Sequence, residues 1–471
     1  MTVLAHGIGG RTDLPLPSEL VLQAGGFVVL VSFLAVGLAW RRPRFGTEEP
    51  EPGDRADPGP TEQLPRGLEH AQLAVRCLLL ALLGYLVARA FTGNPDPDHN
   101  PAPRALYVLL WVGLVPASLV FGPVWRVVNP LRALHRGVCA LLRVPPAGVR
   151  EPPSGLGYWP AAIGLAVFIW LELVPDARAD PAVVGAFIAG YAALITAAAT
   201  VYGARWFSLA DPFEVYSTLI AALSPVGLRT GAGPKSGAGP RSGAGPNSGA
   251  GPRTGAGPKT GGPGLEFRNP LRGLNRVPPA PGLVAMLAVW WGSTVFDGVS
   301  GTSWWATTSQ LAAARSGLPT ELLATVVLVG LIALVALSYR LATGALSATL
   351  VSTLIPIAVG YTIAHYASLL LVEGPRALTQ LVDPSGAAPP LAAVPAPVLI
   401  AAVQVTAILV GHVVGVVAAH DRVLGAAENP TTGVPGKSQV LTDQRRLADE
   451  IPLVLLMILY TMIGIYLLVI A

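Results

Sequence analysis

Ten apolar stretches, each close to twenty residues long, run through this chain of 471 residues. A membrane-spanning helix needs about 20 mostly apolar residues. Charged residues make up only 12% of the chain, against about 25% in soluble proteins, so they are too few to coat a water-facing surface. The sequence therefore predicts an all-α fold, a polytopic transmembrane helical bundle of about ten spans with short interfacial helices. The stretches fall near 19–40, 72–92, 105–123, 157–175, 182–203, 281–298, 322–339, 347–372, 397–419 and 451–470.

The distribution of Lys and Arg predicts the orientation of these spans. Arg41, Arg42 and Arg44 follow the first stretch, and basic residues favour the cytoplasmic side. Alternating from there, 24 of the 31 Lys and Arg residues fall in inner segments and five in outer segments. This asymmetry predicts both termini on the outside.

Two segments between the apolar stretches have the composition of linkers. Residues 45–68 are acidic and rich in proline, which predicts a disordered cytoplasmic loop. Residues 231–260 are five hexapeptides of the type GAGPKS, a composition typical of a flexible tether. We predict a first membrane half at 1–225, a cytoplasmic tether at 226–265 and a second half at 266–471.

Three predicted inner segments place Asn or Asp directly before Pro: Asn129-Pro130, Asp211-Pro212 and Asn269-Pro270. The first side chain caps free N–H groups and Pro fits the first helical position, so each pair predicts a helix start. The amphipathic stretches 131–142 and 213–223 should then lie in the headgroup region or fold back against the bundle. A polar site of Asp211, Glu214 and Tyr216 is the alternative to simple capping.

Few polar residues fall inside the spans, and ionisable groups at membrane depth are usually functional. The eighth stretch carries Tyr361, His365 and Ser368 on one helix face. The ninth carries Gln404 and His412, and the sixth carries Asp297 near its outer end. Glu172 falls at the outer end of the fourth, where an interfacial position is expected.

His365 and His412 are the candidate metal ligands, because imidazole suits zinc and copper, and Asp297 or Glu373 could complete the set. The two histidines differ by about 10 Å in predicted depth, so one metal could bridge them only if a helix tilts or kinks. A proton or substrate path and structural hydrogen bonds between helices are the alternatives. The cluster His420-Asp421-Arg422 is predicted to be a helix-end ionic group.

Four stretches resemble a family of bacterial multi-span proteins known as fenitrothion hydrolase. They are AHGIGGRTDLPLP (5–17), WGSTVFDG (291–298), AHYASLLLVEG (364–374) and VGHVVGVVAAHDR (410–422). The resemblance runs nearly end to end, apart from the tether and the acidic loop. It implies membrane-bound cleavage of an organophosphate triester in a bacterial plasma membrane. It carries over no catalytic residues.

Three functions remain open at this point. In a hydrolase, a divalent metal, zinc or copper, would be held by His365 and His412 and would activate water. The catalytic residues would be Asp297, His365 and His412, and the substrate-binding residues Tyr361, Ser368, Gln404 and His6. A transporter or permease for a small solute is the second function, and a membrane scaffold is the third.

The expected partners are the lipid bilayer and a small apolar or small-solute ligand. No sequence motif indicates binding to nucleic acid. The basic pI near 9.2 comes from the inner loops, so it reflects the membrane topology.

Overall fold

The computed structural model describes residues 18–45, 66–229, 264–383, 385, 387, 396–428 and 439–470. His6, the GAGP repeats and most of the acidic loop lie outside these residues. Their predicted roles therefore remain predictions.

Every predicted apolar stretch is helical in this structure. The third is a composite of α3 (Pro101–Arg104), the π-helical η2 (Ala105–Val112) and α4 (Leu114–Phe121). The other nine correspond to long helices: α1 (Ser18–Ala39), α2 (Arg66–Thr92), α7 (Trp159–Leu173), α8 (Pro181–Tyr202), α12 (Leu283–Ser300), α14 (Thr320–Thr343), α16 (Ile355–Val382), α17 (Pro397–Glu428) and α18 (Gln439–Ile470).

The remaining elements are short and connect the long helices. Those of the first half are η1 (Pro97–His99), α5 (Val124–Val128), α6 (Pro130–Leu142), η3 (Asp176–Ala179), α9 (Arg205–Ala210), α10 (Pro212–Ala221) and β1 (Val226–Arg229). Those of the second half are β2 (Gly264–Phe267), α11 (Pro270–Asn275), α13 (Ser303–Ser316), η4 (Gly344–Leu346), α15 (Ser347–Leu350) and η5 (Val351–Leu354).

The described helices have the length and surface of membrane spans. Seven candidate spans are long and apolar enough to cross a membrane; one of them, Thr320–Val382, contains both α14 and α16. The helices Trp159–Leu173 and Ile451–Leu467 are apolar but shorter. Large apolar side chains such as Leu38, Phe121 and Leu194 are exposed on the outside of the bundle, as expected of a surface that faces lipid.

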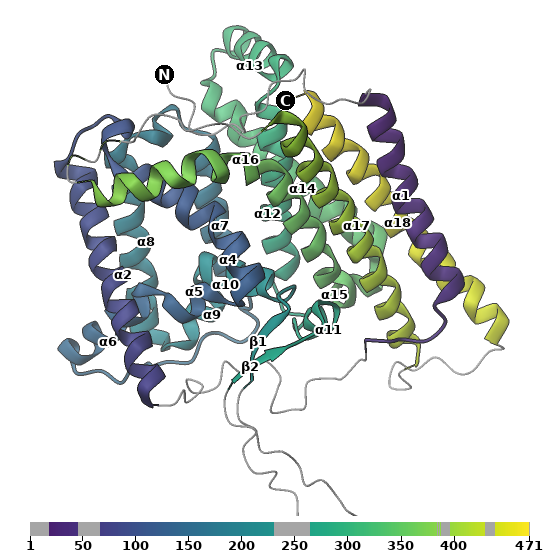
Figure 1. The fold of residues 1–471 in the computed structure, drawn as a ribbon, viewed down its shortest axis with the longest axis horizontal. Coiled ribbons are helices and arrows are strands. Elements are labelled where there is room, and N and C mark those ends of the chain that lie inside the picture. The colour runs from purple at the N-terminus through teal and green to yellow at the C-terminus, as the bar shows by residue number, and fades with distance from the viewer. Residues whose placement is uncertain are drawn as a thin grey trace, which may run out of the picture.

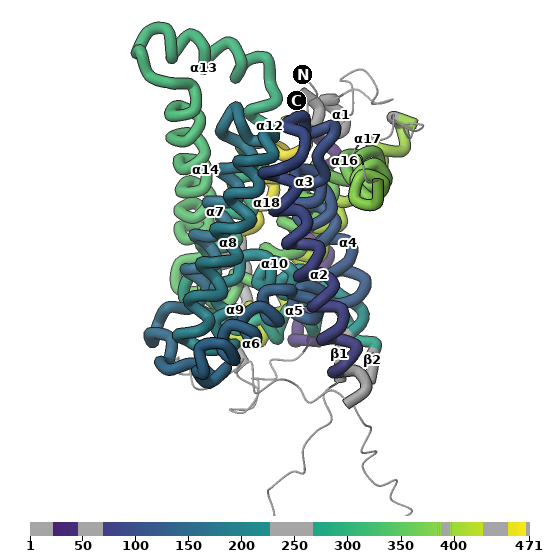
Figure 2. Tube along the Cα trace, turned by 90° about the vertical axis from the view of Figure 1, so that its left-hand side faces the viewer, coloured from purple at the N-terminus to yellow at the C-terminus, as the bar shows by residue number. Residues whose placement is uncertain are grey.

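The long helices stand side by side as a bundle (Figure 1). The start of α1, the end of α18 and helix α13 lie at one end, whereas β1, β2, α6 and α11 lie at the other, as Figure 2 also shows. We refer to these as the α13 end and the β end. α1 packs against α17 and α18, and α7 packs against α12, so helices of the two predicted halves are in contact.

The flanks of the predicted tether are ordered. β1 and β2 pair antiparallel, with Val226 opposite Phe267 and Arg229 opposite Gly264. Residues 226–229 and 264–265, predicted to belong to the tether, are therefore strand, because backbone pairing fixes both ends of the segment.

The sequence predicted one continuous span over 347–372, but the structure divides this stretch into several helical elements. α15 and the 3-10 turn η5 precede α16, which extends to Val382. Pro356 occupies the first turn of α16, where its missing N–H costs no hydrogen bond, so the helix begins there.

All three predicted caps form. The side chains of Asn129, Asp211 and Asn269 accept hydrogen bonds from backbone N–H groups at the starts of α6, α10 and α11. α10 folds back into the bundle and is almost entirely buried. α6 buries one face and exposes Leu141 and Leu142 on the other.

Asp211 also belongs to a buried polar cluster with neighbouring helices. Its carboxylate accepts hydrogen bonds from Asn129 Nδ2 at 2.7 Å and from the Tyr191 hydroxyl at 2.8 Å. Glu214 accepts two from Arg132, at 3.0 and 2.5 Å. These pairs explain Asp211 and Glu214 by capping and packing. Tyr216, the third residue of the predicted polar site, stacks on Trp111 instead, and its buried hydroxyl has no hydrogen-bond partner in the described residues.

Asp211 makes stability depend on pH. Burial, followed by repulsion from Glu214, raises the pKa of Asp211 from 3.8 to about 6. The folded state holds the Asp211 proton more tightly than the unfolded state does. The contribution of Asp211 to the free energy of unfolding is therefore complete below pH 4 and is lost as the pH rises through 6. The shift corresponds to about 3 kcal/mol. We expect the midpoint of thermal unfolding of the parent protein in detergent to decrease as the pH is raised from 5 to 7.5, and to decrease more steeply than that of Asp211→Asn. Equal slopes for the two proteins would contradict this.

A second buried ionic group lies at the α13 end. Arg104 Nε lies 2.9 Å from Glu373 Oε2, and Arg104 Nη2 lies 2.6 Å from Asp98 Oδ1. Arg376 Nη1 also contacts Glu373, at 2.6 Å. Glu373, predicted as a possible metal ligand, is therefore paired with two guanidinium groups, of which that of Arg104 ties α3 to α16.

Arg104→Met should strongly destabilise the protein. Removing one partner of a buried ion pair costs about 3–5 kcal/mol, because the other charge stays buried. The midpoint of thermal unfolding in detergent measures this effect. Arg315→Met, at the exposed end of α13, is the control and should leave the midpoint unchanged. An equal midpoint for the two variants would show that the pair contributes nothing.

Candidate functional site

Glycine lets α16 and α17 approach closely at the level of the predicted polar residues. A Cβ on Gly411 would lie 2.6 Å from the carbonyl oxygen of Pro356, and a Cβ on Gly360 would collide with that of Ala407. Small residues allow such contact between membrane helices. The crossing fixes the positions of Tyr361, His365 and His412.

Asp297 of α12 is the centre of the candidate site. Its Oδ2 lies 2.7 Å from His365 Nε2 and accepts a hydrogen bond of 2.8 Å from the Tyr366 hydroxyl. The Asp297 residue is 2% exposed and Tyr366 is 5% exposed. The structure thus brings together two of the three predicted catalytic residues and adds Tyr366, which the sequence analysis did not assign.

His412 makes different contacts. Its Nδ1 lies 2.9 Å from the carbonyl oxygen of Ile408 in its own helix, and its ring packs edge-on against Tyr361 at 5.7 Å. Its Nε2 is buried without a hydrogen-bond partner in the described part of the chain. The Tyr361 hydroxyl donates to the carbonyl oxygen of Tyr460. None of these contacts involves His365.

The residues predicted to bind substrate are not gathered in one place. Ser368 is buried, and its hydroxyl has no partner among the described residues. Gln404 is half-buried and lines neither of the cavities found in the described residues. His6 lies outside the described residues.

The described residues do not support the predicted two-histidine metal site. No group of three or more His, Cys, Asp or Glu side chains within them is arranged to hold a metal ion. His365 Nε2 faces Asp297 and His412 Nδ1 faces a backbone carbonyl. Zinc or copper at these residues therefore remains a prediction, and the chemistry derived below needs no metal.

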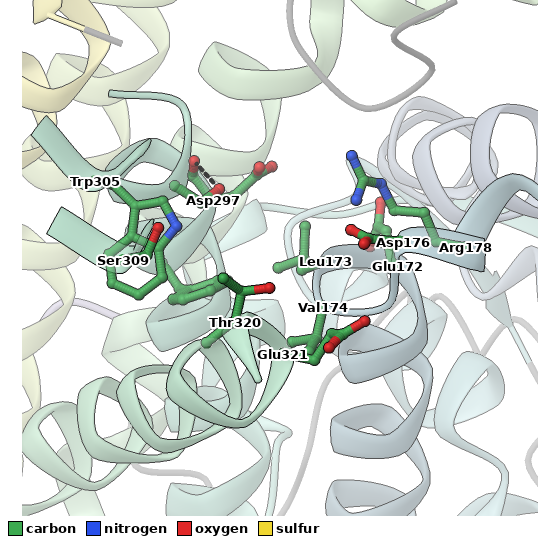
Figure 3. Close-up of a pocket in the computed structure, with 13 residues that line it drawn as sticks. Glu172, Leu173, Val174, Asp176, Arg178, Asp297, Trp305, Ser309, Thr320 and Glu321 are labelled. Atoms are coloured by element: carbon green, nitrogen blue, oxygen red, sulfur yellow. Dashed lines mark hydrogen bonds between the residues drawn. The ribbon is translucent and has the colours of Figure 1, made fainter. Parts of the chain in front are cut away.

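An acidic cavity of about 170 Å³ lies on one side of Asp297, at the α13 end (Figure 3). Figure 3 shows Glu172, Asp176 and Arg178 on one side and Trp305 and Ser309 on the other, with Asp297 between them. The acidic cavity is lined by Glu172, Leu173, Val174, Asp176, Arg178, Phe296, Asp297, Ser300, Trp305, Ser309, Thr320, Glu321 and Ala324.

A smaller space of about 20 Å³, the His365 cavity, is lined by His365 but not by Asp297. It has room for about one water molecule. Residues of α12, α16, α17 and α18 line it: Thr294, Val295, Gly298, Tyr361, Ala364, His365, Ile408, Gly464 and Leu467.

Glu172 is the residue that the sequence analysis undervalued. It is 6% exposed rather than interfacial, and its Oε2 has no hydrogen-bond partner in the described residues. Its position in an apolar stretch was a usable signal, because buried carboxylates are costly and usually functional. Trp305, Ser309 and Glu321 come from α13 and α14 and carry no signal in their own sequence.

Searches against protein-family models, curated proteins and solved structures found no match.

Proposed function

We propose that this chain is a ten-span secondary transporter of a bacterial plasma membrane, in which Asp297 and His365 exchange a proton. One observation carries the proposal: Asp297 lines the acidic cavity, and His365, its hydrogen-bond partner, lines a separate cavity. Ionisable side chains paired inside a membrane typically mark proton or solute paths.

The ten-span arrangement with both termini outside draws on two kinds of support. The excess of Lys and Arg in the inner segments favours it, and it stays at 15 to 5 when the nine in the long segment 204–280 are left out. The start of α1 and the end of α18 at the same end of the bundle (Figure 1) fit an even number of crossings. On this topology the acidic cavity opens toward the outside.

The pair can move a proton without a rearrangement of the backbone. A proton arriving from the acidic cavity reaches Asp297 Oδ2, and the 2.7 Å contact carries it to His365 Nε2. The Tyr366 hydroxyl holds the carboxylate in place from a second direction. His365 then carries protons on both ring nitrogens, and a single water in the His365 cavity could accept the one on Nδ1, which leaves Nε2–H bonded to Asp297 Oδ2.

Hydrolysis of a phosphotriester is the second candidate, favoured by the same pair. A histidine oriented by a buried carboxylate is the arrangement of a general base, so His365 could take a proton from an attacking water. The size of the substrate argues against hydrolysis. A cavity of about 150 Å³ holds benzene, and an aryl phosphotriester is much larger than either cavity here.

Two assays on one preparation separate the candidates. The full chain in proteoliposomes is adsorbed on a solid-supported membrane and given a rapid pH jump, and the same protein is incubated with an aryl phosphotriester that releases nitrophenol. The proposal expects a transient charge displacement and no nitrophenol above that from protein-free liposomes. Nitrophenol release that Asp297→Asn abolishes, without charge displacement, would favour the hydrolase instead.

A further inference from the structure

The acidic cavity has a lining that fits a positively charged ligand. Four carboxyl groups, those of Glu172, Asp176, Asp297 and Glu321, face one guanidinium, that of Arg178. Asp297 already has His365 and Tyr366 as partners. The lining therefore carries an excess of acidic groups that a bound cation would neutralise.

Glu172 supplies an observation independent of this charge count. The Glu172 side chain is among those that line the cavity, it is 6% exposed, and its buried Oε2 has no hydrogen-bond partner in the described residues. A buried polar atom without a partner costs free energy. A ligand that donates an N–H to this atom would remove the cost and add a charge-assisted hydrogen bond.

The other lining residues limit the chemistry of that ligand. The cavity volume of about 170 Å³ suits a molecule a little larger than benzene, which fills about 150 Å³. Trp305 offers an indole ring packed against Phe296 at 5.8 Å between centroids, and such rings attract cations. An organic cation would match both this aromatic ring and the cavity volume.

We propose that the acidic cavity binds a small organic ammonium ion, whose N–H is held by Glu172 and whose charge is shared with Trp305. The proposal deepens the proposed function, because it names the class of solute that the transporter would carry. Binding itself needs only the cavity. A failure of cation binding is therefore distinguishable from a failure of proton exchange at Asp297.

Isothermal titration of the purified full chain in detergent tests this with three probes. Benzylammonium carries the charge and the N–H donors, benzyltrimethylammonium carries the charge alone, and benzyl alcohol carries no charge. We expect benzylammonium to bind at least about tenfold more tightly than either of the others, the value of one charge-assisted hydrogen bond. Equal affinities for the three, or no binding of benzylammonium, would overturn the proposal.

Variants locate the binding in the cavity. Glu172→Gln should weaken benzylammonium binding by at least about tenfold, whereas Glu151→Gln, at an exposed loop position, should not change it. If Glu172→Gln does not fold, Trp305→Leu provides the second test and should also weaken binding. Unchanged affinity in either folded cavity variant would contradict the assignment. Binding without any charge displacement would leave this inference standing and remove the proposed transport.

Discussion

Asp297→Asn is expected to abolish the charge displacement that a pH jump produces in the adsorbed proteoliposomes. Asparagine keeps the shape of the side chain but cannot take up a proton, so the exchange between Asp297 Oδ2 and His365 Nε2 is lost. Loss of a positioned acid or base typically costs a factor of about 100 or more. We expect the displaced charge to fall to the level of protein-free liposomes.

His365→Gln should have the same effect, because it removes the other half of the pair. Tyr366→Phe removes only one hydrogen bond to the carboxylate and should slow the displacement by about tenfold. Asp383→Asn, at the end of α16, is the matched control and should behave like the parent. A full-size displacement in folded Asp297→Asn would exclude this carboxylate as the proton-exchange group.

Gly360→Val is expected to destabilise the protein by overpacking the α16–α17 crossing. Its side chain would meet the carbonyl of Ala407 across the α16–α17 crossing, and the backbone on both sides cannot yield without moving the helices apart. Overpacking typically costs about 1–3 kcal/mol, and a backbone collision should lie at the upper end. We expect a lower unfolding midpoint in detergent and a reduced folded yield.

Gly330→Val is the control for this variant, because a Cβ on Gly330 would meet nothing within 4 Å. Gly411→Val should resemble Gly360→Val, since its Cβ would lie 2.6 Å from the carbonyl oxygen of Pro356. If both crossing variants unfold at the midpoint of Gly330→Val, the close approach of α16 and α17 is not what stabilises this region.

Local rules were sufficient to predict much of the fold from the sequence. The apolar stretches and the three caps at Asn129, Asp211 and Asn269 depend on residues close together in the chain. The break before α16 was missed, although Pro356 marks it. The π-helical turn η2 within the third stretch has no comparable sequence signal.

The candidate site was only partly predictable, because its contacts join residues far apart in the chain. Polarity at membrane depth identified Asp297, His365 and His412. Which of them pair depends on how α12, α16 and α17 pack, and the spacing of residues along one helix does not contain that information. The sequence analysis assigned Glu172 no role, because its helix end was expected at the interface. In the structure, residues of η3, α13 and α14 line the same cavity as Glu172.

Difference infrared spectroscopy of the purified protein through a pH step tests the central claim most directly. Proton exchange at Asp297 predicts a carboxylic C=O band that appears on acidification, shifts in D₂O and is absent from Asp297→Asn but present in Asp383→Asn. If Asp297→Asn retains that band unchanged, or if the parent shows no pH-dependent carboxyl band, Asp297 and His365 do not exchange a proton and the transport mechanism is wrong.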